Sequence, residues 1–385
     1  MRRRKLLIVL LIATSLLLLP QPAIKEVLAN EASKTVASIP AVKPVAEDTP
    51  ILPEPSDRET TAQATQTQPI LDDEPDAISL EVTSAELKEI TEPETLANTE
   101  PDEHFDFGNQ WALGKIGVSD LWDTSTGNEV LVAILDTGID DEHLELAGQV
   151  TAEVDFTSSS SPSDQHGHGT HVAGIIAAKR DGTDVTGIAY DCSLLNVKIA
   201  DDTGSCQMTA LIEGINWAVD RGASVINISI EFREPSPELA EAVNYAWSQG
   251  SLVIAAAGNN GDGSPVYPAY YDHCLAVAAT TQNDELAPLS NHSDWVDVAA
   301  PGFSIYSTVP DNGYSYKSGT SFACAYVSGL AALLYDIVTD SNGDGKLNDE
   351  VRAAIEGGCE EISARGVGGG RIDAVKTIAQ IIAAP

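Results

Sequence analysis

Beyond about residue 101, the sequence predicts a three-layer α/β fold in which a mostly parallel β-sheet is flanked by helices on both faces. Short apolar runs recur in this region and are continuous rather than alternating, as expected for strands buried on both faces. They cover 130–135, 194–199, 225–228, 252–257 and 275–278. Because these runs alternate with helical patterns, right-handed crossovers place the strands side by side in one parallel sheet.

Two of the helices are marked by their own sequence. The segment 208–219 places its apolar residues on one face, at 208, 211, 212, 215 and 219. Ser236 suits the cap of a second helix, and Pro237 suits its first position. Helical segments are also expected at 172–178 and from Ser321 through Leu334. In such a fold, reactive groups lie at the carboxyl ends of the strands.

The N-terminus has the pattern of an export signal. Four basic residues in 1–5 precede an apolar run at 6–19, and small residues at Val27 and Ala29 suit a signal peptidase. We predict a signal peptide at 1–29, so that the protein is exported to the periplasm, the cell surface or the medium. The alternative is an uncleaved anchor, but the apolar run is short for a bilayer, which needs about 20 residues.

Residues 30–100 are rich in Pro, Thr, Ala and Glu and contain almost no aromatic residues. Such a segment buries too little surface to offset its chain entropy, so we predict a disordered acidic linker or propeptide. Aromatic residues return at Phe105, Phe107 and Trp111, and the folded domain is assigned to 101–385. The net charge of −37 excludes a nucleic-acid partner, because phosphate binding needs a basic footprint. Five cysteines are too few and too scattered for a disulfide scaffold.

Four polar residues are candidates for acyl-transfer chemistry. Asp136 directly follows a predicted strand, although Asp before Thr-Gly is also ordinary turn chemistry. His168 is one of three histidines in 166–171, a density that also suits a metal site, but the Glu of a His-Glu-x-x-His zinc helix is missing. Ser321 opens an apolar helix, where a plain N-cap serine is the alternative. Asn259 ends a predicted strand, where a turn asparagine is the alternative.

The combination favours catalysis over these separate alternatives. A serine hydroxyl becomes nucleophilic when a neutral imidazole removes its proton, and a carboxylate holds that imidazole in the required tautomer. The chain order Asp136, His168, Ser321 matches one known arrangement of this triad. The Asn259 amide can donate to the tetrahedral oxyanion beside the Ser321 backbone amide.

The sequence resembles the subtilases from Gln110 to about Ala379. The matching motifs are Asp-Thr-Gly-Ile-Asp at 136–140, His-Gly-Thr-His-Val-Ala-Gly at 168–174, Val-Ile-Asn-Ile-Ser at 225–229, Ala-Ala-Ala-Gly-Asn at 255–259, Ala-Pro-Gly at 300–302 and Gly-Thr-Ser at 319–321. The resemblance implies a subtilisin-like fold and a serine endopeptidase that acts on proteins or peptides. It implies Asp136 as orienter, His168 as general base and acid, Ser321 as nucleophile and Asn259 as oxyanion donor.

The chain departs from the family pattern in two places near these residues. After Ser321 the family usually has a proline in the helix, and this chain has Ala325, which predicts a more regular helix. Where the family continues Ser-Leu-Gly, this chain has Ser229-Ile230-Glu231. No part of 30–100 resembles the compact prodomain of secreted members.

By the resemblance, the substrate site is built from three segments. Ser229, Ile230 and Glu231 flank the primary pocket together with the segment 256–258, in which Ala256 and Gly258 are the wall residues. Gly204 and Ser205 offer the other edge for an extended substrate strand. Val266 narrows the pocket floor, so large aromatic side chains are expected to bind poorly. Glu231 either favours a basic group at the pocket mouth or is a solvated loop carboxylate.

Structural calcium is predicted at two places. Asp340, Asn342 and Asp344 place oxygen atoms at alternate positions of a glycine-containing loop, and Glu350 falls one position short of the usual bidentate ligand. The alternative is an acidic turn between two helices. The second place rests on resemblance and involves Glu145 with the loop 179–185, which contains Asp181.

Two further functions compete with an exported endopeptidase. Glu231 and Ala325 also suit a catalytically impaired relative that serves as a calcium-stabilised binding module. The acidic linker and apolar N-terminus suit a surface-anchored stalk. We expect a monomer with no stable membrane span after signal cleavage.

Overall fold

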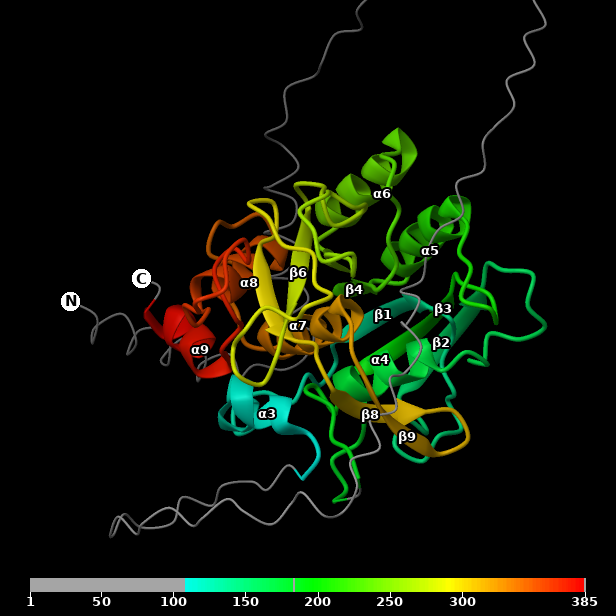
Figure 1. The fold of residues 1–385 in the computed structure, drawn as a ribbon, viewed down its shortest axis with the longest axis horizontal. Helices are drawn as coiled ribbons and strands as arrows, with labels where there is room; N and C mark the ends of the chain where they lie inside the picture. Colours follow the sequence, from blue (N-terminus) through cyan, green and yellow to red (C-terminus); the bar gives the residue numbers. More distant parts are fainter. Residues whose placement is uncertain (1–107, 183, 384–385) are drawn as a thin grey trace, which may run out of the picture. The chain divides into compact units, whose positions relative to one another are not determined.

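The computed structural model describes residues 108–182 and 184–383, and its core is a seven-stranded sheet (Figure 1). The strand order is β2-β3-β1-β4-β5-β6-β7, and every neighbouring pair is parallel. The strands are β1 (Leu131–Asp136), β2 (Val150–Asp155), β3 (Ser193–Lys198), β4 (Val225–Ile228), β5 (Leu252–Ala256), β6 (Cys274–Thr280) and β7 (Val298–Pro301). The predicted signal peptide at 1–29 and linker at 30–100 lie outside the described residues.

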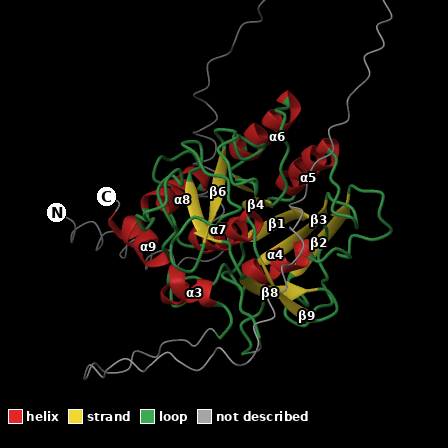
Figure 2. Cartoon of the chain, in the orientation of Figure 1, coloured by secondary structure: helices red, strands yellow, loops and turns green. Residues whose placement is uncertain are grey.

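Helices cover both faces of this sheet (Figure 2). On β1, Val132 and Ile134 join one hydrophobic core, whereas Ala133 and Leu135 join a second core on the opposite face. The first core packs α3 (Trp111–Ile116), η1 (Val118–Leu121), α4 (His168–Ala177), α7 (Thr320–Tyr335), α8 (Asn348–Gly357) and α9 (Ala374–Ala383). The second packs α5 (Met208–Asp220) and α6 (Pro237–Ser248). The predicted three-layer α/β fold is therefore confirmed.

The predicted elements differ from the observed ones mainly at their ends. β4 has the predicted bounds, but β1 ends one residue later than predicted, so Asp136 is the last residue of the strand. The helix cap at Ser236 is confirmed, because its hydroxyl accepts a 3.2 Å hydrogen bond from the Leu239 amide. The edge strand β2 was not predicted, since its residues alternate in burial and it lacks a continuous apolar run.

A two-stranded antiparallel hairpin was also missed. It consists of β8 (Ile305–Val309) and β9 (Gly313–Lys317), and it packs against α4. Its turn residues Asp311 and Asn312 both have positive φ, 64° and 57°, as a tight hairpin turn requires. The turn sequence Asp-Asn-Gly was the available signal for this hairpin.

Disulfide bonds and membrane-spanning helices are both absent from the described part of the chain. Its five cysteines are free thiols, and four of them are buried. None of its helices combines the length and the apolar character that crossing a membrane requires.

Candidate active site

Two strand ends and two helix starts bring the four candidate residues to one edge of the sheet (Figure 1). Asp136 is the last residue of β1, and Asn259 lies three residues beyond the end of β5. His168 is the first residue of α4, and Ser321 is the second residue of α7. The Phe322 ring, next to Ser321, lies 5.4 Å from the His168 ring between centroids, so the two helix starts meet there.

A buried hydrogen bond joins the aspartate and the histidine. His168 Nδ1 lies 2.7 Å from Asp136 Oδ1, and the two residues are only 6% and 0% exposed. The same carboxylate oxygen accepts a 2.8 Å bond from the Thr137 amide. A carboxylate at Nδ1 holds the ring in the tautomer whose Nε2 can accept a proton.

A glycine permits this close approach of helix to strand. A Cβ atom on Gly169 would lie 2.1 Å from the Gly138 carbonyl oxygen and 3.1 Å from Asp136 Cβ. A larger residue would therefore push α4 away from β1 and lengthen the bond between His168 and Asp136.

Asp164 fixes the loop that leads to His168, and sequence reasoning did not identify it. Its buried carboxylate accepts bonds of 2.8–2.9 Å from the Gly167 and Thr170 amides. It also accepts the hydroxyl groups of Thr137, at 2.9 Å, and Thr170, at 2.7 Å. Since Gly167 at the N-cap offers no side chain, Asp164 supplies the cap of α4 from outside the helix.

Ser321 lies inside α7 and does not cap it. The N-cap is Gly319, so the alternative of a plain N-cap serine is wrong. At the second helical position, a backbone amide has no acceptor within the helix and carries the positive end of the helix dipole. Ser321 Oγ lies 3.5 Å from the Ser229 carbonyl oxygen, and Ser229 Oγ donates to the Ser321 carbonyl at 3.3 Å.

Helix α7 is continuous and is tied to the sheet. It runs unbroken from Thr320 to Tyr335, with Ala325 inside it, as expected for a helix without proline. The buried Asn227 of β4 accepts the Ser328 hydroxyl at 2.9 Å, and Cys324 Sγ lies 3.2 Å from the same oxygen. These contacts fix the position of α7 against β4.

The side-chain amide of Asn259 is oriented by Thr320. Asn259 Oδ1 accepts the Thr320 amide at 2.9 Å and the Thr320 hydroxyl at 3.0 Å. The Thr320 hydroxyl in turn accepts the Gly258 amide at 3.1 Å. The NH₂ end of Asn259 lies beside the N-cap of α7, since a Cβ atom on Gly319 would lie 3.3 Å from Asn259 Nδ2. Sequence reasoning did not identify Thr320.

The other two histidines of the cluster have separate environments. His171 Nε2 lies 3.2 Å from the Ser315 carbonyl, its ring packs 4.5 Å from the Phe322 ring, and burial lowers its pKa to about 3. His166 is exposed, and partial desolvation lowers its pKa. Within 108–182 and 184–383, no three His, Cys, Asp or Glu side chains are grouped so that they could hold a metal ion in this arrangement, and this applies to the histidine cluster and to both predicted calcium positions.

The predicted substrate segments lie beside one another. Ser229, Ile230 and Glu231 follow β4, and the wall segment 256–258 follows from β5, its parallel neighbour. Glu231 is 7% exposed, and its Oε1 accepts the Asn260 side-chain amide at 3.2 Å. A Cβ on Gly258 would lie 2.1 Å from Glu231 Oε2, so the carboxylate lies directly against this wall. Val266 is buried.

Gly204 and Ser205 form the turn before α5. The Gly204 amide donates to the Asp201 carbonyl at 2.9 Å, and the Ser205 carbonyl accepts the Asp201 amide at 2.9 Å. Gly204 has φ of 82°, a conformation that favours glycine.

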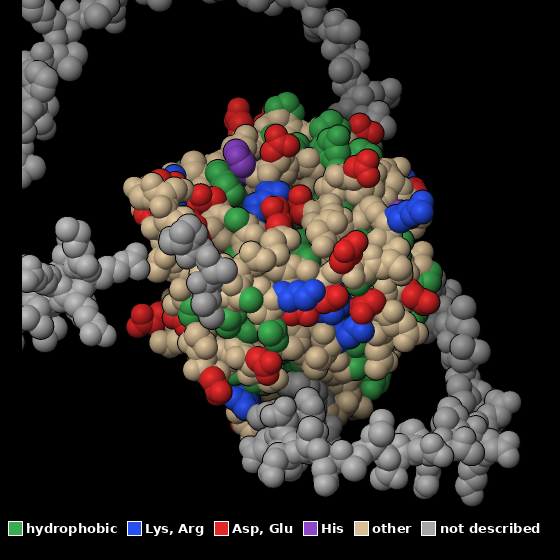
Figure 3. Space-filling model, turned by 90° about the vertical axis from the view of Figure 1, so that its left-hand side faces the viewer, with side chains coloured by type: hydrophobic (Ala, Val, Ile, Leu, Met, Phe, Trp, Pro, Cys, Tyr) green, Lys and Arg blue, Asp and Glu red, His purple; other side chains and the backbone are tan. Residues whose placement is uncertain are grey.

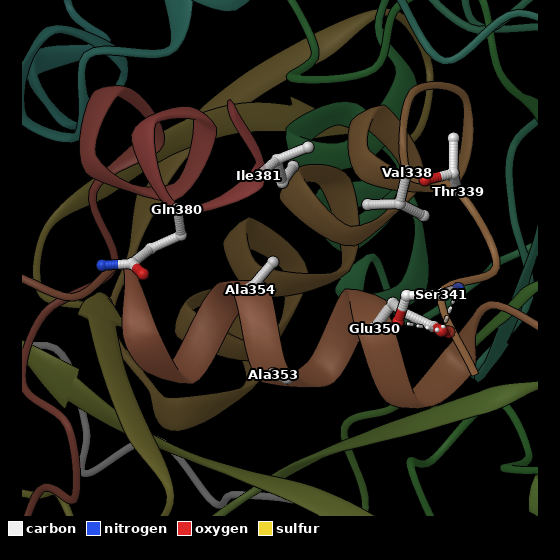
Figure 4. A pocket seen from close by; sticks show the side chains of 8 residues that line it. All are labelled: Val338, Thr339, Ser341, Glu350, Ala353, Ala354, Gln380 and Ile381. Carbon is white, nitrogen blue, oxygen red and sulfur yellow. Dashed lines mark hydrogen bonds between the residues drawn. The ribbon is translucent and has the colours of Figure 1, made fainter. Parts of the chain in front are cut away.

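The loop at 340–350 closes on its own acidic side chains. Asp340 accepts the amides of Gly343 and Gly345 at 2.6 and 2.8 Å, and Asn342 Oδ1 accepts the Asp344 amide at 2.8 Å. Figure 4 shows Glu350 bonded to Ser341, whose amide and hydroxyl donate to Glu350 Oε1 at 2.8 and 2.9 Å. The pocket drawn there, of about 320 Å³, lies between α8 and α9.

The second predicted metal position has a different arrangement. Glu145 is buried, and its Oε1 accepts the Tyr314 hydroxyl at 2.8 Å. Asp181 is exposed on the loop after α4, and Lys179 in that loop donates its amide to the Glu145 carbonyl at 2.9 Å.

The bonds to Asp164 predict a large effect on stability. Asp164→Ala leaves buried amide and hydroxyl donors without their acceptor, so we expect the free energy of unfolding to fall by about 2–4 kcal/mol. Chemical denaturation measures this loss. The exposed acid Asp141 serves as matched control, and Asp141→Ala is expected to stay within about 0.5 kcal/mol of wild type. Equal free energies of unfolding for the two variants would contradict the role of Asp164 in fixing the loop before His168.

Comparison with known proteins agrees with this geometry. A model of the subtilase family matches residues 127–357. Thermitase of Thermoactinomyces vulgaris is 42% identical over 282 residues, which cover 72% of this chain and 99% of thermitase. A thermophilic serine proteinase of Bacillus sp. (strain AK1) is 41% identical over 285 residues, 73% of this chain and 69% of that protein. The minor extracellular protease Epr of Bacillus subtilis (strain 168) is 37% identical over 282 residues, 72% of this chain and 42% of Epr. The chain therefore belongs to the subtilase family and is a serine endopeptidase.

Proposed function

We propose that peptide bonds are hydrolysed through an acyl-enzyme on Ser321. His168 removes the Ser321 proton as the hydroxyl attacks the scissile carbonyl, and it then gives that proton to the departing amine. Asp136 keeps the His168 tautomer and stabilises the imidazolium. Water then attacks the acyl-enzyme with His168 again acting as base. The observation that carries this proposal is the buried 2.7 Å bond between His168 and Asp136 at the start of α4.

The oxyanion is proposed to bind between the Asn259 side-chain amide and the Ser321 backbone amide. Both of these donors are preorganised, because Thr320 holds Asn259 Oδ1 and α7 holds Ser321. A preorganised donor needs no rearrangement as negative charge develops on the carbonyl oxygen. The rival hypothesis of an impaired binding module is not favoured, since Ala325 leaves α7 continuous and Glu231 lies against Gly258 rather than at Ser321.

This mechanism predicts non-additive losses in kcat. Ser321→Ala and His168→Ala are each expected to remove most turnover of a peptide substrate, and the double variant is expected to be little worse, because the two residues act as one unit. Asn259→Ala is expected to lower kcat by about 10²–10³-fold with little change in KM, the magnitude known for loss of such a donor in subtilisin. An effect of Asn259→Ala on KM alone would contradict its role.

We propose that the substrate binds as an extended strand, with its residue before the scissile bond between the segments 229–231 and 256–258. Gly204 and Ser205 provide backbone groups on the other side of that strand. Glu231 supplies a buried negative charge to the pocket wall, and Val266 restricts the floor. The pocket therefore favours a basic side chain over a large aromatic one.

Glu231→Gln tests this preference with little change in shape. Wild type is expected to cleave peptides with Arg or Lys before the scissile bond faster than matched peptides with Phe. The variant is expected to lose about 10- to 150-fold of that ratio, the range for a hydrogen bond to a charged group. Profiling a peptide library with both proteins measures the ratio. An unchanged preference would remove Glu231 from the site.

We propose that the 340–350 loop binds structural calcium. Asp340, Asn342, Asp344 and Glu350 would hold the ion, and oxygen ligands of this kind suit calcium. At the start of α8, Glu350 Oε2 and Asp349 Oδ1 are buried, and the two carboxyl groups interact with each other. Burial and the adjacent Glu350 raise the pKa of Asp349, so a cation would relieve this crowding of acids. Glu145 with Asp181 stays a second proposed site, supported by resemblance.

Thermal unfolding with calcium or a chelator distinguishes the two positions. Calcium at about 100 times its Kd adds about 2.7 kcal/mol to the native state, so chelation is expected to lower the wild-type midpoint. Asp344→Ala is expected to lose that response, while Asp141→Ala keeps it. If only Asp181→Ala loses the response to calcium, the 340–350 loop is a turn without a bound ion. If chelator leaves the wild-type unfolding midpoint unchanged, both calcium sites are excluded.

We propose that the protein is exported with cleavage after Ala29. The support is the basic and apolar N-terminal sequence, together with a relative named an extracellular protease. N-terminal sequencing of secreted, catalytically inactive Ser321→Ala protein is expected to begin at Asn30, because this variant cannot process itself further. Retention of residues 1–29 would instead support the alternative of an uncleaved N-terminal anchor.

A further inference from the structure

Lys317 is a basic residue in a strongly acidic catalytic domain. Residues 108–385 contain 38 Asp and Glu but only 12 Lys and Arg. Figure 3 shows acidic and basic side chains interspersed over one face of the molecule, with more acidic than basic ones. An acidic peptide is therefore repelled over much of the surface, and any local attraction depends on individual cations.

The hairpin directs Lys317 toward the first turn of α4. Lys317 ends β9 and lies four residues before Ser321. Ser315, two residues earlier, shares its face of the strand, whereas Tyr316 between them is 52% exposed. Ser307, paired opposite Ser315, donates its hydroxyl to the His171 carbonyl at 2.9 Å. The face that carries Lys317 is thus the face that lies on α4.

The charge of Lys317 reaches the histidines beside the reaction. Lys317 is half-buried, and its positive charge contributes, after burial itself, to lowering the pKa of His171 and, to a smaller extent, that of His166. Among the described residues, no carboxylate lies within salt-bridge distance of its ammonium group, whereas Lys115, Lys198 and Lys376 are all paired. Lys317 therefore presents an uncompensated charge at the edge of the site.

The mechanism assigns this edge to one half of the substrate. The acyl half binds against the ends of β4 and β5, where Glu231 and Gly258 lie. The departing amine receives its proton from His168, so the chain that follows the scissile bond leaves on the side of α4. The hairpin that carries Lys317 packs on that side.

We propose that Lys317 is a specificity-determining residue that selects an acidic side chain directly after the scissile bond. This inference rests on the proposed function. Its partner is a carboxylate of the substrate, and the contact is made until the leaving group departs. The Lys317 contact therefore acts on acylation and is absent from deacylation.

Matched quenched peptides that differ only in Glu or Gln after the scissile bond test the proposal, with cleavage positions verified by mass spectrometry. Wild type is expected to show a kcat/KM ratio of about 3 to 5 in favour of Glu, the range for a partly exposed ion pair. Lys317→Gln is expected to bring the ratio to about 1, and Lys317→Glu to invert it. Arg365→Gln, which removes an exposed positive charge outside the proposed sites, is expected to keep the wild-type ratio.

Two further measurements separate this role from a general electrostatic one. When amino acid amides compete with water for the acyl-enzyme, wild type is expected to transfer to the Glu amide more than to the Gln amide, and Lys317→Gln is expected to lose that difference. Raising salt from about 0.05 to 0.5 M is expected to shrink the wild-type ratio.

Three results would overturn the inference. These are a wild-type ratio of 1, a wild-type ratio retained by Lys317→Gln, and an equal loss of the ratio in Arg365→Gln. Failure of the proposed function is a different result, namely cleavage of both peptides by Ser321→Ala.

Discussion

The buried hydrogen bond between His168 and Asp136 sets the most demanding constraint on this fold. It requires the end of a central strand and the start of a helix to meet within 2.7 Å between side-chain atoms. Gly169 removes the side chain that would hold them apart, and Asp164 fixes the loop between them. The two buried cores on either face of the sheet hold β1 in place, so the geometry of the site follows from the packing of the whole domain.

A second connection runs between β5 and α7 through Thr320. By holding the oxygen end of Asn259, Thr320 decides which way the amide donors face, and it does so from the residue before Ser321. One side chain therefore relates the proposed oxyanion donor to the proposed nucleophile. The same edge carries an acidic residue and a basic residue on its two sides, with Glu231 beyond β4 and Lys317 on the hairpin next to α4. In the proposed binding mode, this arrangement gives the two halves of a peptide different electrostatic surroundings.

The central strands and the candidate site could be predicted from the sequence because the patterns that mark them are local. Continuous apolar runs predicted the central strands, and the motifs around Asp136, His168, Ser321 and Asn259 predicted the candidate site. Thr320 escaped because its contact with Asn259 spans 61 residues of sequence. Asp164 escaped because it lies outside α4, three residues before the Gly167 N-cap, and its bond to Thr137 spans 27 residues. The β8–β9 hairpin escaped because β8 is Ile-Tyr-Ser-Thr-Val and β9 is Gly-Tyr-Ser-Tyr-Lys, so no continuous apolar run marks either strand.

The most direct test of the account is the rate of labelling by an active-site-directed fluorophosphonate, measured on wild type, Ser321→Ala and Asp136→Asn. The probe forms a covalent bond only with an activated serine, so wild type is expected to react and Ser321→Ala is expected to stay unlabelled. Asp136→Asn keeps the shape but favours the wrong histidine tautomer, and its labelling at neutral pH is expected to be slower by about 10⁴-fold. Labelling of Ser321→Ala, or wild-type speed in Asp136→Asn, would contradict the account.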